Sequence, residues 1–239
     1  MKDTTKLFQQ GTLANLVDGL LTGTMTISEL LSHGDTGIGT GEGLDGELIV
    51  AQGHPFLAQN DGTVIEVDAD FTVPFATVHF ASDMPALTAE LTDVTFTNLK
   101  EVIANLYPYE NIFYAVTLTG DFQQIKTRVV EKQYPPYPKL VEVAEKQALF
   151  TQENVRGQII GYFSPELYNG VAASGLHLHF LADDHSIAGH LLEFVLTSGT
   201  LTIQPFKTLE NNFPIDNQQF MESKLELSSL AKEIEQSEK

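Results

Sequence analysis

The segment from Ser174 to Phe194 constrains this chain most, because its pattern calls for two strands and places histidines on both. It reads SGLHLHFLADDHSIAGHLLEF: an alternating apolar run, a polar stretch that ends in glycine, and a second apolar run. Such a pattern predicts two strands joined by a loop. Alternate side chains of a strand share a face, so His177 and His179 project side by side. The second strand, starting at His190, delivers a third imidazole.

Three imidazoles that converge with one position left open are typical of a catalytic zinc site. The chain has no cysteine, so a tightly bound transition metal must rely on histidine and carboxylate ligands. His185 competes with His190 as third ligand, but its place in the predicted loop favours a solvated side chain. The residues by themselves also permit ordinary core or surface histidines that happen to alternate.

Length and cysteine content bound the class of protein. With 239 residues the chain can bury a full core, as one large domain or two small ones. The absence of cysteine excludes a disulfide framework and fits a reducing compartment. The start, MKDTTKLFQQGTLANLVDG, lacks a signal-peptide pattern, and no apolar stretch is long enough for a membrane span. We therefore expect a cytoplasmic protein that does not enter a membrane.

The charge of the chain argues against nucleic acid as a partner. The formal net charge is −19, from 13 basic and 32 acidic residues, and no basic stripe offsets it. Such a chain repels phosphate backbones. The two arginines, Arg128 and Arg156, stand out against this background as groups that can meet an anionic substrate.

The segment 33–50 contains six glycines. It lacks the lysine of a P-loop, and it does not follow a clear strand and open a helix, so nucleotide binding is not expected. Glycine-rich backbone that lets a ligand or another chain approach closely is the better interpretation. The segment leads into a strand at Glu47–Val50.

Most of the remaining pattern predicts strands, with a few short helices. The expected strands have period-two or apolar patterns and cover 63–68, 71–80, 112–120, 122–130, 157–163 and 200–206. Gly120 and Asp121 predict a hairpin turn that places Arg128 on a strand. The expected helices begin after Thr12, at a capping box of Asn98 with Glu101, within 133–147, and at about residue 225.

This order of elements predicts an α+β protein dominated by mixed or antiparallel sheets, because strands and helices do not alternate regularly. The proline-rich start of 133–147 is the best boundary by composition. We expect two closely associated sub-domains. Residues 1–132 form a β-rich N-terminal unit with the glycine-rich loop, and residues 133–239 form a β-rich metal-binding unit with a terminal helix.

Two further residues are candidates for chemistry. Arg128 carries a fixed charge and a fork that suits a carboxylate, although a surface ion pair is the simpler role. Glu47 lies beside the glycine-rich loop and can act as a general acid or base, although a solvated glutamate at a strand end is equally consistent.

Longer strings of residues resemble the acetolactate decarboxylases. The strings occur in the same order and at compatible spacings, and they are SHGDTGIGTGEGLDGELI, FYAVTLTGDFQQIKTR, PPYPKLVEV, NVRGQIIGYFSP, SGLHLHFLADD and AGHLLEF. Together they cover nearly the whole chain and are far more specific than a single His-x-His pair.

The resemblance implies a zinc ion held by the three histidines named above, and not by His185. It implies that Arg128 and Glu47 act in the active site and that Thr40 lines the same pocket. It also implies that a glutamate of the C-terminal tail reaches the metal, which is Glu238, or Glu235 as the alternative.

The implied reaction converts 2-acetolactate to (R)-acetoin and carbon dioxide, in a homodimer that takes a small-molecule substrate. Zinc would act as a Lewis acid on the ketone and hydroxyl oxygens, and Glu47 or the tail glutamate would deliver the proton. Other three-histidine enzymes remain as alternatives: a zinc hydrolase or hydratase, or a cupin-like oxygenase with Asp183 as a further ligand. A non-catalytic β-sandwich binding module is the third possibility.

Overall fold

The computed structural model describes residues 2–144, 147–225 and 233–234. Strands account for 49% of the residues and helices for 17%, which confirms a strand-dominated α+β protein with several sheets and few helices. No helix among these residues is long and apolar enough to cross a membrane.

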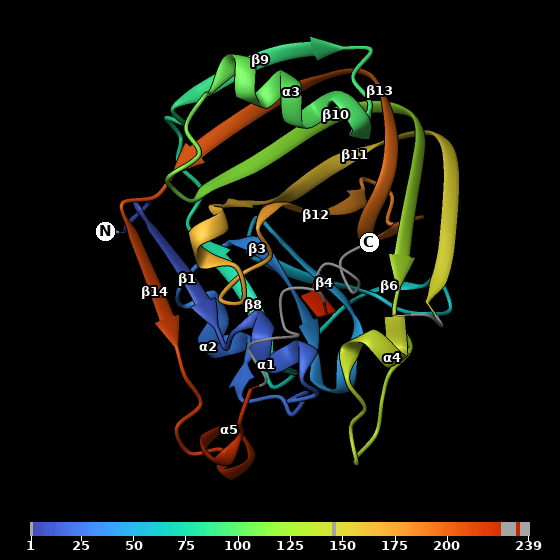
Figure 1. Ribbon diagram of the computed structural model, residues 1–239. Coiled ribbons are helices and arrows are strands. Elements are labelled where there is room, and N and C mark those ends of the chain that lie inside the picture. The colour runs from blue at the N-terminus through green and yellow to red at the C-terminus, as the bar shows by residue number, and fades with distance from the viewer. Residues whose placement is uncertain (1, 145–146, 226–232, 235–239) are drawn as a thin grey trace.

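Two large sheets form the body of the molecule (Figure 1). The seven-stranded sheet has the order β14 (Thr208–Asn212), β1 (Lys6–Gln10), β8 (Phe75–His79), β3 (Thr36–Gly41), β4 (Asp45–Ala51), β5 (His54–Ala58), β6 (Val64–Glu66). The five-stranded sheet has the order β10 (Tyr114–Val129), β11 (Ala148–Ser164), β12 (Gly175–Ala182), β13 (Ala188–Pro205), β9 (Leu87–Thr92). Neighbouring strands are antiparallel except β1 and β14, which makes the first sheet mixed.

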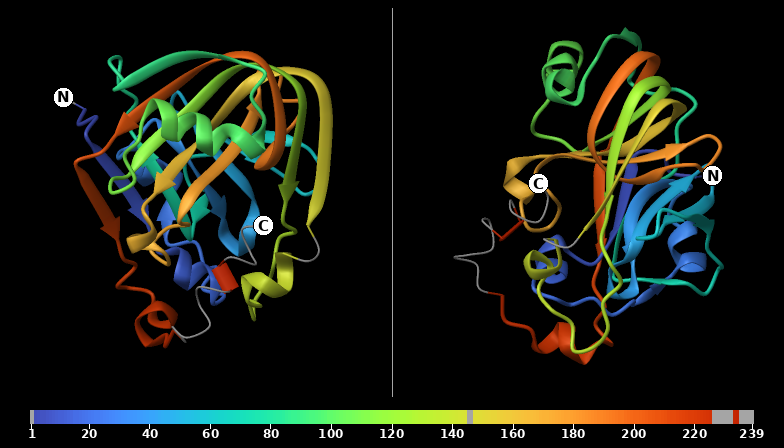
Figure 2. Two further views of the ribbon diagram at one scale, coloured as in Figure 1. Left: turned by 45° about the horizontal axis from the view of Figure 1, so that its top comes forward. Right: turned by 90° about the vertical axis from the view of Figure 1, so that its right-hand side faces the viewer.

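Smaller elements cover and connect the sheets. They are the two-stranded sheet of β2 (Met25–Thr26) and β7 (Thr72–Val73), the helices α1 (Leu13–Val17), α2 (Ile27–Leu31), α3 (Phe96–Leu106), α4 (Leu140–Ala144) and α5 (Gln218–Glu222), and short 3-10 turns at Glu42–Leu44 and Glu166–Tyr168. The amphipathic α3 buries Leu99 and Ile103 in the core of the five-stranded sheet, and it lies over that sheet in both views of Figure 2.

A shared apolar core joins the two large sheets. Ile38 and Ile49 of the seven-stranded sheet pack in one cluster with Val129, Ile160 and Leu181 of the five-stranded sheet. All five side chains are nearly or fully buried. The facing surfaces of the sheets are thereby fixed relative to each other, and polar groups that point inward beside this core are held in place as well.

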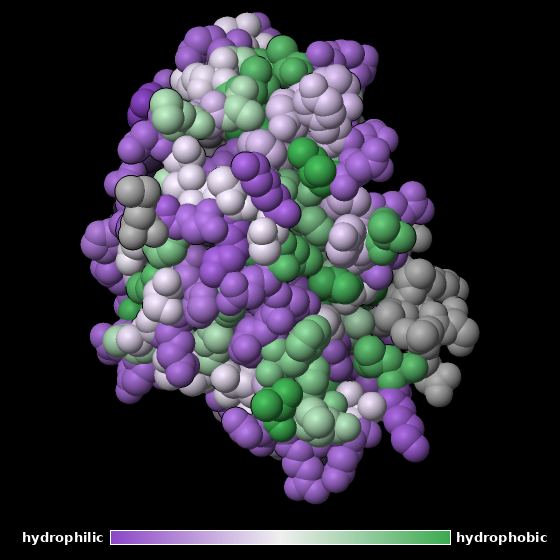
Figure 3. Space-filling model, turned by 90° about the vertical axis from the view of Figure 1, so that its left-hand side faces the viewer, coloured by the Kyte–Doolittle hydropathy of each residue, from purple (hydrophilic) through white to green (hydrophobic). Residues whose placement is uncertain are grey.

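On the side shown at the left of Figure 1, the surface is hydrophilic over much of its centre, with hydrophobic side chains scattered between (Figure 3).

The predicted hairpin at Gly120 and Asp121 is wrong. Residues Tyr114–Val129 form one continuous strand, which pairs with β11 on one side and with β13 on the other. Gly120 faces glycines on both neighbours, Gly157 and Gly199, and the register with β13 shifts just beyond it. Pairing on both edges outweighs the local turn preference of a Gly-Asp pair, and the irregularity is absorbed as a bulge.

The histidine-bearing pair of strands is confirmed. His177 and His179 lie on β12, and His190 lies on β13, with a turn at residues 183–187 between the strands. Because β13 pairs with β12 and also with β10, the strands β10, β11, β12 and β13 form a closed circuit of pairings. The histidines therefore sit on strands that are fixed on both edges.

The glycine-rich segment forms strands β3 and β4 rather than an open loop, apart from a short turn. A Cβ atom at Gly37 would lie 2.1 Å from the carbonyl oxygen of Thr77 on β8. The close approach expected from the glycines is thus made by a neighbouring strand of the same chain.

The predicted starts of the helices are correct only in part. Thr12 caps α1, as predicted, through a hydrogen bond that its side chain accepts from the backbone N–H of Asn15. The capping box of α3 is formed by Thr95 with Asn98, three residues before the predicted one. Most of the predicted terminal helix, with Glu235 and Glu238, lies outside the described residues.

The division at residue 132 stays a prediction. In the structure, the five-stranded sheet takes β9 and β10 from one side of that boundary and β11, β12 and β13 from the other.

Candidate functional site

Strand register brings the three histidines together. His179 lies directly opposite His190 in the antiparallel pairing of β12 with β13, and His177 is two residues away on the same face of β12. One ring nitrogen from each histidine lies within 4.8 Å of those of the other two. His179 is 1% exposed and His190 is 6% exposed, so the cluster is largely shielded from water.

The surroundings of His179 prepare it to bind a metal. Its Nδ1 lies 3.1 Å from the carbonyl oxygen of Leu48 on β4, and because a carbonyl only accepts, Nδ1 carries the hydrogen. Nε2 therefore keeps its lone pair; it is buried and makes no hydrogen bond within the described part of the chain. A buried nitrogen whose ring is oriented by a backbone carbonyl is the usual form of a metal-binding histidine.

Two of the three imidazoles are held in the neutral form. Burial lowers the pKa of His179 well below its ordinary value. The charges of His177 and Arg128 lower this pKa further, whereas the hydrogen bond to Leu48 raises it. Burial, followed by the charge of Arg128, has the same effect on the pKa of His190. Neutral imidazole is the form that coordinates a metal, so these residues fit a transition-metal ion.

Arg128 continues the row of side chains across the sheet. It lies opposite His190 in the pairing of β10 with β13, and its Nη2 is 3.4 Å from His190 Nε2. Its Nη1 donates a hydrogen bond of 3.0 Å to the side-chain oxygen of Gln147. The residue is 5% exposed, so a permanent positive charge is presented to the pocket with little screening by water.

The seven-stranded sheet supplies two further polar side chains to the site, Glu47 and Thr40. Glu47 on β4 pairs in register with Thr40 on β3, so both side chains project from the same face. Glu47 Oε2 lies 3.4 Å from His179 Nε2, and Thr40 Oγ1 donates a 2.8 Å hydrogen bond to the carbonyl of Gly46. The site is therefore built where the two sheets meet.

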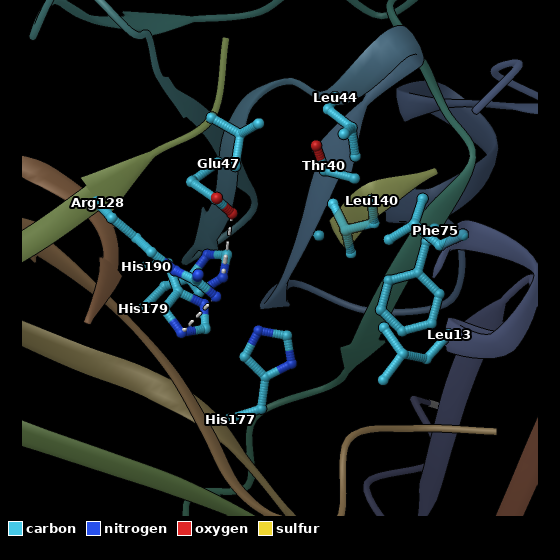
Figure 4. A pocket seen from close by; sticks show the side chains of 13 residues that line it. Leu13, Thr40, Leu44, Glu47, Phe75, Arg128, Leu140, His177, His179 and His190 are labelled. Atoms are coloured by element: carbon cyan, nitrogen blue, oxygen red, sulfur yellow. Dashed lines mark hydrogen bonds and ion pairs between the residues drawn. The ribbon is translucent and has the colours of Figure 1, made fainter. Parts of the chain in front are cut away.

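All these side chains line one pocket, whose opposite wall is apolar (Figure 4). The polar lining residues are Thr40, Glu47, Arg128, His177, His179 and His190. The apolar lining residues, called the apolar wall below, are Leu13, Leu16, Leu44, Phe75, Val130 and Leu140. In Figure 4, Leu13, Leu44, Phe75 and Leu140 lie opposite Arg128, Glu47 and the histidines, with Thr40 beside Leu44. Such a pocket can hold a small molecule with charged or chelating oxygens on one side and alkyl groups on the other.

The structure separates the other candidates from the site. His185 lies in the turn between β12 and β13 and packs its ring 4.4 Å from that of Phe56. Asp183, considered for a cupin-like site, has a half-exposed side chain 3.5 Å from Arg156. Arg156 also pairs with Asp121 on the surface at 2.9 Å.

Sequence reasoning missed the residues that support the site. Gln147 lies at the end of the proline-rich segment and carried no signal of its own. Leu13 and Leu16 belong to the helix predicted after Thr12, but nothing in the sequence assigned that helix a part in the site. The carbonyl of Leu48 could not be assigned a role before the contact between the two sheets was known.

Comparisons with known proteins give a consistent result. Residues 7–227 match the model of the family described as alpha-acetolactate decarboxylase. The chain is similar to proteins of that name from Lactococcus lactis subsp. cremoris, at 37% identity over the full length of both chains, and from Bacillus subtilis strain 168, at 35% identity over 98% of this chain and 91% of the relative.

Two solved structures resemble the fold closely. The structure of alpha-acetolactate decarboxylase from Bacillus subtilis strain 168 superposes with a TM-score of 0.93 at 35% identity, and it covers 98% of this chain and 99% of its own. A protein from Staphylococcus aureus described as similar to alpha-acetolactate decarboxylase gives a TM-score of 0.93 at 36% identity, covering 97% and 99%.

We expect His179→Ala to lose bound metal, because it removes one of the three clustered imidazoles. The metal content of purified protein, measured by mass spectrometry after dialysis, should fall from about one ion per chain to nearly zero. His185→Ala is the matched control and should keep its metal. Full occupancy in His179→Ala would contradict the assignment of the ligands.

Proposed function

Because this chain belongs to the alpha-acetolactate decarboxylase family, we propose that it converts 2-acetolactate to (R)-acetoin and carbon dioxide with a zinc ion bound by His177, His179 and His190. The observation that carries this proposal is the single pocket in which three clustered imidazoles face a buried arginine and a carboxylate. The family assignment makes the protein a decarboxylase. The metal, the mechanism and the roles of the residues are the proposal.

The chemistry of the substrate explains why such a site is needed. When a 2-hydroxy-3-keto acid loses carbon dioxide, the electron pair of the broken bond stays on C2. It is tolerable only if it delocalises onto the neighbouring ketone as an enediolate. A bound zinc ion would supply Lewis-acid stabilisation for the ketone and hydroxyl oxygens, so no organic electron sink is required.

Arg128 is proposed to hold the carboxylate that leaves. Its guanidinium is always charged and can form two parallel hydrogen bonds to a carboxylate. The bond to Gln147 restricts its rotation, and strand pairing fixes its distance from His190. We expect these hydrogen bonds to hold the breaking C–C bond perpendicular to the plane of the ketone.

Glu47 is proposed to deliver the proton that completes acetoin. It projects from the seven-stranded sheet, whereas Arg128 projects from the five-stranded sheet. Delivery of a proton from one fixed side sets the configuration of the product. Glu238, or Glu235 instead, is proposed as the second acid from the C-terminal tail, and Thr40 is proposed to contact the substrate beside Glu47.

The apolar wall is proposed to receive the two methyl groups of acetolactate. Phe75 and Leu13 line the pocket opposite the histidines (Figure 4). Apolar burial there would exclude water from the reacting carbons and strengthen the electrostatic interactions of Arg128 and Glu47.

Racemic 2-acetolactate tests the function directly. Purified protein should release carbon dioxide and form (R)-acetoin, and a zinc chelator should abolish the reaction until zinc is added back. Chiral gas chromatography follows the product. Failure to form acetoin would refute the activity, and undiminished activity after complete zinc removal would refute the zinc dependence.

Glu47→Gln separates proton transfer from metal binding. The amide keeps the size of the side chain but cannot donate a carboxylic proton, so kcat should fall by about 10²- to 10⁴-fold. Zinc content should remain as in the wild type. A kcat within about twofold of wild type would show that Glu47 does not transfer a proton in the limiting step.

We further propose a homodimer. The seven-stranded sheet ends at β14 and β6, which have no outer neighbour among the described residues, and open sheet edges favour association with a second copy. Light scattering should give twice the chain mass of 26.3 kDa. A single-chain mass at micromolar concentration would argue against the dimer.

A further inference from the structure

The apolar wall of the pocket is assembled from segments that are far apart in the sequence. Leu13 and Leu16 come from α1, and Leu140 begins α4. Ile234, from the C-terminal segment, is 4% exposed and does not line the pocket, but it belongs to the same apolar cluster as these three leucines. Figure 1 and the left view of Figure 2 show residues 233–234 as a short red piece between α1 and α4.

One lysine connects these three segments. Lys139 Nζ lies 3.2 Å from Asp18 Oδ1 and 3.3 Å from Glu233 Oε2. Each of the three charged residues is next in sequence to a buried member of the apolar cluster. The neighbouring pairs are Val17 with Asp18, Lys139 with Leu140, and Glu233 with Ile234.

A separate contact brings two of these segments together, the end of α1 and the residues just before α4. Gly19, just after α1, has a φ of +90°, and a Cβ atom placed there would lie 2.8 Å from the carbonyl oxygen of Pro138. The backbone before Lys139 therefore lies directly against the end of α1. The two ion pairs of Lys139 extend this contact to the C-terminal segment.

These ion pairs do not serve mainly to stabilise the fold. The side chains of Lys139, Asp18 and Glu233 are 40%, 27% and 20% exposed, and partly exposed ion pairs contribute little to stability. Helices α1 and α4 have five residues each, too few to hold their position by their own hydrogen bonds. Donation to Asp18 and Glu233 raises the pKa of Lys139, so the charge persists across the neutral range.

We propose that Lys139 is a positioning residue for substrate binding. Through Asp18 and Glu233 it holds α1 and α4 together with the segment of Ile234, and so keeps the pocket-lining residues Leu13, Leu16 and Leu140 in place against the alkyl groups of the substrate. The effect on the substrate rests on the proposed function, whereas the effect on the wall does not. Loss of the clamp formed by Lys139, Asp18 and Glu233 should loosen the wall and weaken substrate binding. The chemical step should persist, because the metal ligands, Arg128 and Glu47 lie on the other wall.

Lys139→Met tests the clamp, because it keeps the apolar stem and removes the charge. We expect KM for 2-acetolactate to rise about three- to tenfold, the scale of one or two exposed ion pairs, with kcat within about twofold. Lys139→Arg should restore most of the affinity. Lys6→Met is the matched control: Lys6 pairs with Glu210 at 2.7 Å, and neither residue lines the pocket.

Hydrogen exchange of the α1 amides gives a readout that does not depend on turnover. These amides should exchange faster in Lys139→Met than in the wild type or in Lys6→Met, while the midpoint of thermal unfolding of Lys139→Met changes little. Unchanged exchange in Lys139→Met would overturn the proposal even if the protein formed no acetoin. An unchanged KM, or a loss confined to kcat, would overturn the role in substrate binding. Absence of acetoin with faster exchange would refute the proposed activity and leave the clamp supported.

Discussion

The register between β12 and β13 is the constraint on which the site depends. It sets His179 opposite His190, and the pairing of β13 with β10 extends the row to Arg128. A slip of one residue would turn these side chains to the other face of the sheet. The closed circuit of strands and the apolar cluster on the far face, with Leu178 and Leu191, resist such a slip. The same burial that fixes the register also lowers the pKa values of His179 and His190 and keeps these two imidazoles neutral.

The seven-stranded sheet supplies groups that the five-stranded sheet does not provide. It contributes the carbonyl of Leu48, which orients the ring of His179, and the carboxylate of Glu47, which lies 3.4 Å from Nε2 of that ring. Both come from β4, so one strand sets the tautomer of a ligand and the position of the proposed acid. The apolar core between the sheets keeps these distances short. The opposite wall is apolar and takes part of its residues from the short helices α1 and α4, which the partly exposed ion pairs of Lys139 join.

The sequence predicted which site residues lie on strands and which share a strand face, but not how the two sheets bring them together. Alternation predicted that His177 and His179 share a face, and the β-pattern predicted that Arg128 lies on a strand; both are local properties. The hairpin at Gly120 was wrong, because pairing with β11 and β13 on both edges overrides a turn signal that the isolated segment carries. The meeting of Glu47 with His179 depends on sheet packing, to which no pattern along one strand points. Its place in the site came from the family resemblance instead.

We propose that one zinc ion is held by the three imidazoles at the junction of the sheets. Anomalous diffraction at the zinc edge, from crystals of protein loaded with a single equivalent of zinc, tests it most directly. We expect one strong peak about 2.0–2.1 Å from a ring nitrogen of each of His177, His179 and His190. A peak elsewhere on the chain, with these three nitrogens unligated, would contradict it.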